Sequence, residues 1–298
     1  MKVGQERFSD INALLNERLE AKKHLVAVHR GSWGGNIIQN TVGAYIAAER
    51  MGADMVESDV NCTTDGVLYS FHDGHEFDVL GTLKNIKEMS SFEVEANLPL
   101  NSVHLRCKTP VSKLADVLEW LPEKMLVNID RAWDIFPKVL EELDRHPKAL
   151  QRVVLKAPLR GKHAGVDVAD AWKALEEHPT KYMFMPICYS LDDVKEALTH
   201  KDINIVGCEI IAFHDTDELY QDEAVAYIHD QGLYAWVNAI QLGDYKRDPL
   251  YGPLDDDISV LKDPALGWGK LFEKKIDIIQ TDWPALLSTY RDQILGKK

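Results

Sequence analysis

Cysteine is scarce in this sequence, and its spacing excludes the common cysteine-based sites. The four cysteines, Cys62, Cys107, Cys188 and Cys208, include no CxxC pair, and no histidine stands at zinc-finger spacing from them. Three of them lie in apolar, strand-like runs. We therefore expect buried free thiols rather than disulfides or a structural zinc site.

Long apolar runs are also absent. No stretch approaches the roughly 18 consecutive apolar residues of a membrane-spanning helix. Residues 1–23 have the pattern of a polar amphipathic helix and lack the apolar core of a signal peptide. These features predict no membrane span and favour a cytoplasmic location.

Positive charge is in deficit, because 34 Lys and Arg residues stand against 48 Asp and Glu residues, a net charge of -14. A protein that binds nucleic acid generally presents a basic face, so nucleic acid is not expected as a substrate or partner. A small anionic substrate remains compatible with this charge if a metal ion and a few cations gather at its site. The sequence gives no indication of the oligomeric state.

Eight short apolar runs alternate with segments of helical periodicity over most of the 298 residues. This alternation predicts a parallel sheet covered by helices, and eight units favour closure into a (β/α)₈ TIM barrel, an α/β fold. We expect one TIM-barrel domain over residues 1–298, with 1–23 as an N-terminal helix. The expected strands are 24–30, 54–60, 125–130, 152–157, 182–188, 204–211, 233–239 and 276–281, and the expected helices are 41–52, 134–145, 166–177, 191–199, 217–230 and 284–295.

A β-hairpin interrupts the alternation after the second strand. Residues 67–72 read as a short extra strand, and an Asp-Gly turn joins it to strand 54–60. The returning strand brings His72 opposite Glu57, to within a residue or two.

Two connections, residues 73–122 and 241–272, are longer than usual βα loops. We expect both insertions at the mouth of the barrel, where loops of this architecture build active sites. The second insertion contains Tyr245, Tyr251 and Trp268. We predict that it covers the mouth and sets the preference for the leaving group; a solvated surface loop is the alternative.

Carboxylates stand at the ends of two neighbouring strands. Glu57 and Asp59 are two residues apart and point to the same side of their strand, and Asp130 ends the next one. Carboxylates this close repel each other unless a cation intervenes, and oxygen donors of this kind suit Mg²⁺ or Ca²⁺. The alternative is an ion-paired cluster in which Arg30, Arg131 or Lys156 is the cationic partner.

Two histidines accompany these carboxylates. His29 ends the first strand and His72 ends the hairpin, and imidazole titrates near neutral pH, as a general acid and base must. Single histidines at strand ends are often structural, but the convergence of two on a carboxylate cluster favours catalysis. Arg30 and Lys156 are candidates to bind a phosphate.

The ordered motifs resemble the glycerophosphodiester phosphodiesterase family. The resemblance extends over nearly the whole chain from residue 24, and the ordered set is far more specific than any one piece. The motifs are HRG at 29–31, NT at 40–41, E-x-D at 57–59, T-x-D-G at 63–66, HD at 72–73, W-V-N at 236–238 and T-D-W-P at 281–284.

This resemblance implies a barrel enzyme that uses a divalent metal to hydrolyse a glycerophosphodiester to glycerol phosphate and an alcohol. On the matching positions, His29 and His72 are the acid and base, and Glu57 and Asp59 are metal ligands. The resemblance also implies that Arg30 contacts the phosphate. Trp236, in the strand-seven motif, is expected to contact the substrate.

The sequence departs from the family pattern at three positions. Asp130 stands where the family usually has Glu, Ala132 where it has Lys, and Gln39 where it has Glu. Lys156 on the next strand is a candidate to replace the missing lysine charge.

Two alternatives to the glycerophosphodiesterase activity follow from these departures. An Asp as third ligand also occurs in sphingomyelinase D-like phospholipases, so a lipid phosphodiesterase of the phospholipase D or sphingomyelinase D type is one alternative, although no amphipathic stretch rich in Trp, Phe and Lys supports it. A non-catalytic barrel that binds a phosphoester is the other. The retention of both histidines and three acids argues against it.

Overall fold

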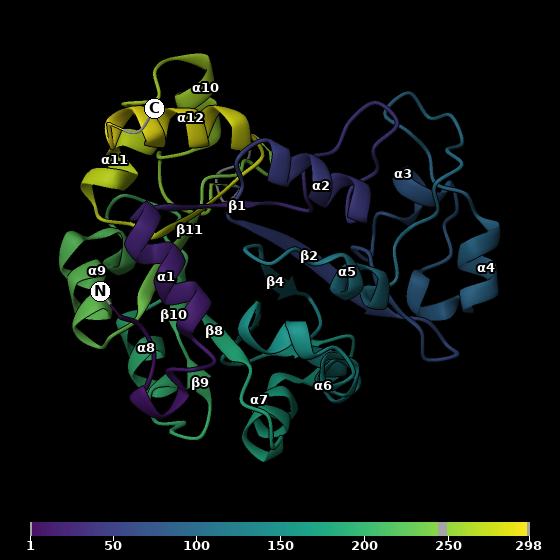
Figure 1. Cartoon of the computed structure of the whole chain (residues 1–298), viewed down its shortest axis with the longest axis horizontal. Helices are drawn as coiled ribbons and strands as arrows, with labels where there is room; N and C mark the ends of the chain where they lie inside the picture. The colour runs from purple at the N-terminus through teal and green to yellow at the C-terminus, as the bar shows by residue number, and fades with distance from the viewer. Residues whose placement is uncertain (1, 244–248, 297–298) are drawn as a thin grey trace.

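The computed structural model describes residues 2–243 and 249–296. Eight parallel strands close into a barrel, because β1 pairs with both β12 and β2 (Figure 1). The predicted (β/α)₈ barrel is confirmed. In barrel order the strands are β1 (Leu25–Val28), β2 (Met55–Cys62), β4 (Leu126–Asp130), β5 (Val153–Pro158), β8 (Met183–Cys188), β10 (Gly207–Ile210), β11 (Tyr234–Asn238) and β12 (Ile278–Thr281).

The sixth expected strand, 204–211, is divided. Its first two residues form β9 (Asn204–Ile205), which pairs with β8, and the barrel strand β10 begins at Gly207. A Cβ atom at Gly207 would lie 2.3 Å from the ring of Tyr234, so the strand approaches its neighbour more closely than a side chain would allow.

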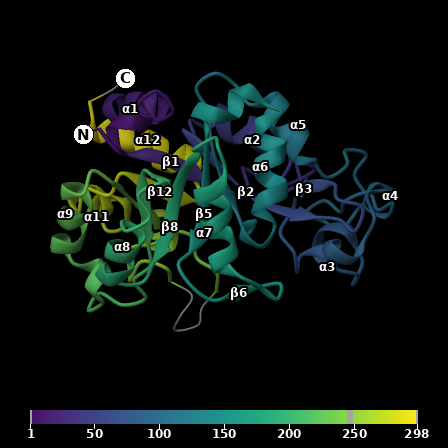
Figure 2. The same ribbon diagram turned by 90° about the horizontal axis from the view of Figure 1, so that it is seen from below.

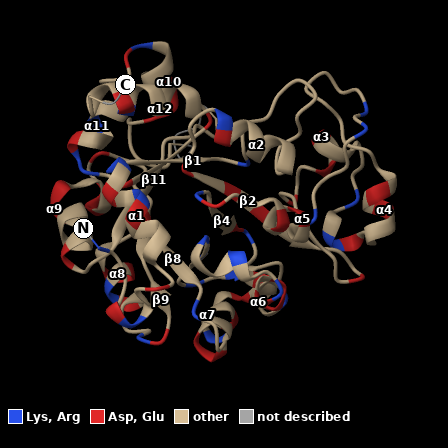
Figure 3. Ribbon diagram, viewed as in Figure 1, with Lys and Arg blue, Asp and Glu red and all other residues tan. Residues whose placement is uncertain are grey.

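Helices on the outside of the barrel bury one apolar face each against the strands. In α6 the buried residues Phe136, Val139, Leu140 and Leu143 recur at helical spacing. Acidic and basic residues mix on the remaining faces, as on a solvated surface (Figure 3). These helices are α2 (Val42–Arg50), α6 (Phe136–Asp144), α7 (Val168–Glu177), α8 (Leu191–Ala197), α9 (Asp222–Asp230) and α12 (Pro284–Ile294). Short 3₁₀ helices are η1 (Glu6–Phe8), η2 (Ile86–Glu88), η3 (Trp133–Ile135), η4 (Pro147–Gln151) and η5 (Glu218–Tyr220).

The N-terminal helix α1 (Ala13–Lys22) packs on the amino-terminal end of the barrel (Figure 1). Its buried residues Leu14, Leu15 and Leu19 join a core cluster that includes the first residue of six of the barrel strands. The barrel interior is therefore closed at this end, and the opposite end remains for the site.

The hairpin strand β3 (Leu68–Ser70) pairs antiparallel with β2, as predicted. Val60 lies opposite Ser70, and the Phe71 amide donates to the Asp59 carbonyl at 2.8 Å. Continuing this register places His72 across from Ser58, one residue from the predicted partner Glu57.

Insertion 73–122 builds a second, smaller core beside the barrel. Its elements are α3 (Glu76–Leu80), η2, α4 (Ser91–Ala96) and α5 (Leu114–Trp120). Ile86, Met89 and Val94 pack there against Tyr69 and Phe71 of the hairpin. Figures 1 and 2 both show α3 and α4 to one side of the barrel.

The described part of insertion 241–272 contains α10 (Asp256–Leu261) and α11 (Trp268–Glu273). Tyr251 and Trp268 are buried there, so this part is packed rather than solvated, whereas Tyr245 lies outside the described residues. A small hairpin after β5, formed by β6 (Lys162–His163) and β7 (Val166–Asp167), was not expected.

The four cysteines are buried and free, as expected. Among the helices of the described residues, none has the length and apolar content to cross a membrane.

We expect Leu15→Ala to destabilise the protein by about 2–5 kcal/mol, the usual effect of removing a fully buried leucine side chain. Leu15 has no exposed surface and lies in the cluster that closes the barrel. Urea unfolding would measure the change, and Leu83→Ala, at a side chain that is 89% exposed, is the matched control. Equal stability of the two variants would contradict this role of α1.

Candidate active site

Glu57, Asp59 and Asp130 meet at the carboxyl end of the barrel. Strands β2 and β4 are neighbours, with Asp59 in register with Asp130, and alternation along β2 puts Glu57 on the same side as Asp59. One oxygen of each residue lies within 4.8 Å of the other two. The structure thus brings together the three carboxylates that the sequence singled out.

The three carboxylates repel one another, and the pKa values of Glu57 and Asp59 show how unequally this repulsion is offset. Burial, together with the nearby charges of Asp59 and Asp130, raises the pKa of Glu57 well above its usual range. For Asp59, burial acts in the same direction, but Arg30 and other partners outweigh it and lower its pKa.

Glu57 has one acceptor atom to spare. Its Oε2 accepts from the Arg30 amide at 2.9 Å, whereas Oε1 is buried without a hydrogen-bond partner among the described residues. A cation between the three carboxylates would satisfy this oxygen and relieve the repulsion. The donor set consists of carboxylate oxygens, which fits Mg²⁺ or Ca²⁺.

Arg30 joins the carboxylates to the loop after β1. Its Nε lies 3.1 Å from Asp59 Oδ2, and its Nη1 donates to Gln39 Oε1 at 2.9 Å. The same Nη1 lies 3.2 Å from His75 Nε2. The Asn40 side chain also donates to Asp59 Oδ2, at 2.8 Å. The loop therefore holds Asp59 and the guanidinium together.

The two candidate catalytic histidines are each held through Nδ1. His29 Nδ1 lies 3.1 Å from Asp282 Oδ1, and His72 Nδ1 lies 2.7 Å from the Asp73 carbonyl oxygen. Nε2 of each ring is then the nitrogen available for proton transfer. Burial lowers the pKa of His72 to about 4, although Asp59 opposes this shift.

Lys156 and Trp236 belong to a buried polar chain behind Asp130. Lys156 Nζ lies 2.8 Å from Asp130 Oδ2 and 2.7 Å from Glu209 Oε2. Asn238 donates to Glu209 at 2.7 Å and accepts from Trp236 Nε1 at 2.9 Å. Lys156 is 2% exposed and Trp236 is fully buried, so neither offers a free surface to a substrate.

Two of the ion pairs that the alternative reading expected are present, and Glu57 takes part in neither. Arg30 pairs with Asp59 and Lys156 with Asp130, but Arg131 pairs instead with Asp73, at 3.1 Å.

Sequence reasoning missed His75 and gave no role to Asp282 or Glu209. His75 packs edge-on against His72, with ring centroids 4.7 Å apart, and contacts Arg30. Nothing in the local sequence distinguishes it from a surface histidine. For Glu209 the sequence did offer a sign of function, because an acidic residue stands inside an otherwise apolar strand. In the structure its side chain is 4% exposed.

Residues 29–238 match the model of the glycerophosphoryl diester phosphodiesterase family. The chain belongs to this family.

Two curated family relatives match parts of the chain. A glycerophosphodiester phosphodiesterase of Caldanaerobacter subterraneus is 33% identical over 132 residues, which are 41% of this chain and 51% of the relative. A probable glycerophosphodiester phosphodiesterase 2 of Mycobacterium tuberculosis is 29% identical over 147 residues, 48% of this chain and 53% of the relative. The chain thus spans about half the length of the curated relatives that it matches.

Solved structures share the fold over most of the chain. A glycerophosphoryl diester phosphodiesterase from Parabacteroides distasonis aligns with a TM-score of 0.74 at 15% identity, covering 99% of this chain and 94% of the other. A phosphodiesterase from Oleispira antarctica, solved with the product sn-glycerol-3-phosphate, aligns with a TM-score of 0.58 at 17% identity, covering 90% and 96%.

A divalent cation should stabilise this protein against unfolding. At 100 times its dissociation constant, Mg²⁺ or Ca²⁺ would add about 2.7 kcal/mol if it binds only the folded state. We expect Glu57→Gln to raise the stability of the chelator-treated protein, because one of three repelling carboxylates loses its charge, and to reduce the increment from the cation. Unfolding curves with cation and with chelator measure both effects.

The control is Asp78→Asn, which alters a carboxylate whose side chain is 62% exposed and lies outside the cluster. It should keep the wild-type increment. Failure of both cations to stabilise the wild type, or a full increment in Glu57→Gln, would rule out this metal site.

Proposed function

We propose that this protein is a metal-dependent phosphodiesterase that hydrolyses glycerophosphodiesters to glycerol phosphate and an alcohol. The observation that carries the proposal is the group of three carboxylates within 4.8 Å of one another, together with two histidines whose Nδ1 atoms are held. Membership of the family and the glycerol phosphate bound by the Oleispira antarctica protein support the choice of substrate.

Glu57, Asp59 and Asp130 would hold Mg²⁺ or Ca²⁺. When bound, such an ion polarises a phosphate oxygen and offsets the charge that builds up in the transition state. Arg30 is held through Nε and Nη1 by Asp59 and Gln39, which leaves Nη2 to donate to a phosphate oxygen.

For Lys156 and Trp236 we propose a supporting role instead of the expected substrate contact. Their burial favours this role, since both lie behind Asp130 in the buried polar chain. Burial acts to lower the pKa of the Lys156 ammonium, but the carboxylates of Asp130 and Glu209 beside it outweigh burial and raise the pKa, so the group stays charged. That charge fixes the orientation of Asp130.

The contacts of the two histidines support different roles. His72, held by a neutral carbonyl and with a lowered pKa, is suited to accept the proton of the attacking hydroxyl. His29 is held at Nδ1 by the Asp282 carboxylate, and we assign it to protonation of the leaving alkoxide through Nε2. If the neighbouring glycerol hydroxyl attacks, a cyclic phosphate forms, and water opens it with the two roles exchanged.

Leaving groups of different basicity test this assignment. His29→Ala and His72→Ala should each lower kcat for a glycerophosphodiester by about 10²–10⁴-fold. With a p-nitrophenyl leaving group, which departs without protonation, His29→Ala should recover most of the wild-type rate and His72→Ala should not.

His200→Ala is the control, because His200 pairs with Glu176 and packs on Trp172, away from the three carboxylates. Recovery of both variants with the p-nitrophenyl ester would refute the division of roles. Near wild-type turnover of either variant on the natural class of diester would refute the proposed chemistry, and so would a wild type that binds the diester without hydrolysing it.

A further inference from the structure

An apolar groove of about 470 Å³ borders the reaction centre at the start of α12. Its walls come from the loop after β1, the end of α2 and the first turn of α12. The large apolar side chains in it are unusually exposed: Trp33 by 52%, Met51 by 44%, Trp283 by 48% and Leu286 by 47%. Apolar side chains gathered in a concave surface of this size are typical of a ligand site.

The groove is continuous with the catalytic residues. Asp282 lines it and also contacts His29 Nδ1 at 3.1 Å. Gly31, on the opposite wall, directly follows Arg30. An occupant of the groove therefore begins beside the histidine that we assign to protonation of the leaving alkoxide.

A second groove, which Arg30 and Trp33 line, also borders the reaction centre and offers polar partners to the glycerol part of the substrate. Gln39, His75, Asp78 and Ser102 supply polar groups to its lining. His75 in turn packs against His72, the proposed base. The hydroxyls of glycerol would find hydrogen-bond partners there, and the apolar groove beside His29 would then take the alcohol that departs.

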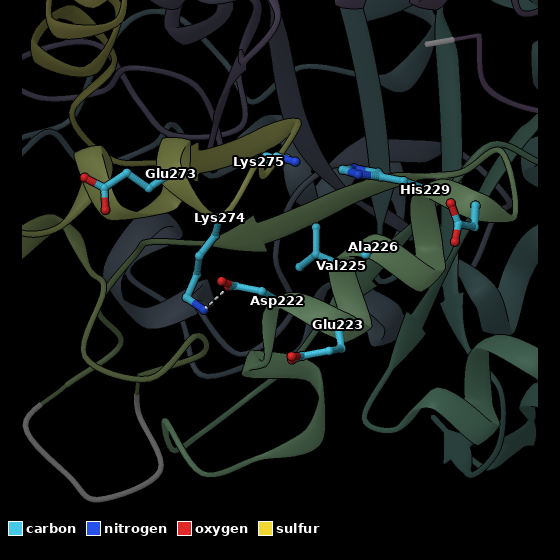
Figure 4. A pocket seen from close by; sticks show the side chains of 9 residues that line it. Asp222, Glu223, Val225, Ala226, His229, Glu273, Lys274 and Lys275 are labelled. Carbon is cyan, nitrogen blue, oxygen red and sulfur yellow. Dashed lines mark hydrogen bonds and ion pairs between the residues drawn. The ribbon is translucent and has the colours of Figure 1, made fainter.

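A third groove, between α9 and residues 273–275, differs in character (Figure 4). Its lining is rich in charged residues, and Lys274 there pairs with Asp222 at 2.7 Å. Lys275 precedes β12, so this groove lies toward the amino-terminal end of the barrel, away from the carboxylates.

The lining of the apolar groove identifies the chemistry of its occupant. Asp282 is its one charged residue, and it stands at the end next to His29. Trp283, Leu286 and Met51 offer apolar surface along the rest. A hydrocarbon chain would cover that surface and remove it from water, whereas a polyhydroxylated alcohol would leave its hydroxyls without partners.

We propose that this groove binds a hydrocarbon chain on the leaving alcohol, so that the enzyme acts on glycerophosphodiesters of chain-bearing alcohols. Water is the second reactant: in the overall hydrolysis its oxygen bonds to phosphorus and it loses one proton. The bond from phosphorus to the alcohol oxygen breaks, His29 supplies one proton to that oxygen, and glycerol phosphate and the free alcohol leave. This inference rests on the proposed function and specifies its substrate.

A homologous series of glycerophosphoalkyl diesters, from methyl to dodecyl and used as monomers below their micelle concentration, tests the proposal. We expect kcat/KM of the wild type to rise about two- to fourfold per methylene until the groove is filled, the range for partial to full burial of each CH₂. Trp283→Ser and Leu286→Ser should flatten this dependence and leave the methyl ester unaffected.

Leu83→Ser and Leu261→Ser are matched controls, since these side chains are 89% and 77% exposed and do not line the groove. They should retain the wild-type slope. A flat wild-type series with good turnover of the methyl ester would overturn this inference alone. An equal loss on all esters in Trp283→Ser and Leu286→Ser would also overturn it. A wild type that hydrolyses none of the series would overturn the proposed function as well.

A second comparison tests whether the groove binds a cationic leaving group instead of a hydrocarbon chain. Glycerophosphocholine and its uncharged 3,3-dimethylbutyl analogue have leaving groups of nearly equal size. If the groove binds hydrocarbon, the uncharged ester should be cleaved at least as well. A tenfold preference for the choline ester would show that Asp282 and the tryptophans bind a cation, and would overturn the proposal.

Discussion

Repulsion among carboxylates at the mouth of the barrel is the constraint on which the rest of the site depends. The structure places four carboxylates there, and two cationic side chains contact them. The formal excess is two negative charges, which one divalent cation would neutralise. The carboxylates are Glu57, Asp59, Asp130 and Glu209, and the cations are Arg30 and Lys156. Each cation touches a carboxylate other than Glu57, and Glu57 is the residue whose pKa is raised and whose Oε1 has no partner among the described residues. The deficit of positive charge is thus localised where a metal ion would correct it.

The departures from the family pattern at strand β4 are consistent with this balance. Asp130 is one methylene shorter than the usual glutamate, and Ala132 carries no charge. Lys156 extends from the next strand, β5, to Asp130 at 2.8 Å, and Glu209 holds the ammonium from the other side at 2.7 Å. A shorter carboxylate with a fixed counter-ion has less freedom to move than a glutamate. We therefore propose that Lys156, on the neighbouring strand, supplies the charge of the missing lysine.

Sequence periodicity predicted the barrel and the carboxylate group well, because both follow from strand alternation and from the rule that parallel strands end on one side. It also placed His72 across the hairpin within the expected range of a residue or two. Burial is a tertiary property that periodicity does not predict, and the full burial of Trp236 is the reason we propose a supporting role for it. Sequence periodicity did not predict the apolar groove. Trp33, Met51 and Trp283 come from three separate segments, so they form no continuous amphipathic stretch.

The described part of insertion 241–272 supports the site by hydrogen bonds to the turn that carries Asp282. Asp256, in α10, is 2% exposed and accepts from the Asp282 amide at 2.8 Å and from Trp268 Nε1 at 2.9 Å. Burial raises its pKa to about 7 despite these donors. Asp256 therefore holds the turn that presents Asp282 to His29, and the same turn opens into the apolar groove. Because one turn positions both the proposed acid and the wall of the leaving-group groove, a change at Asp256 would alter proton delivery and alcohol preference together.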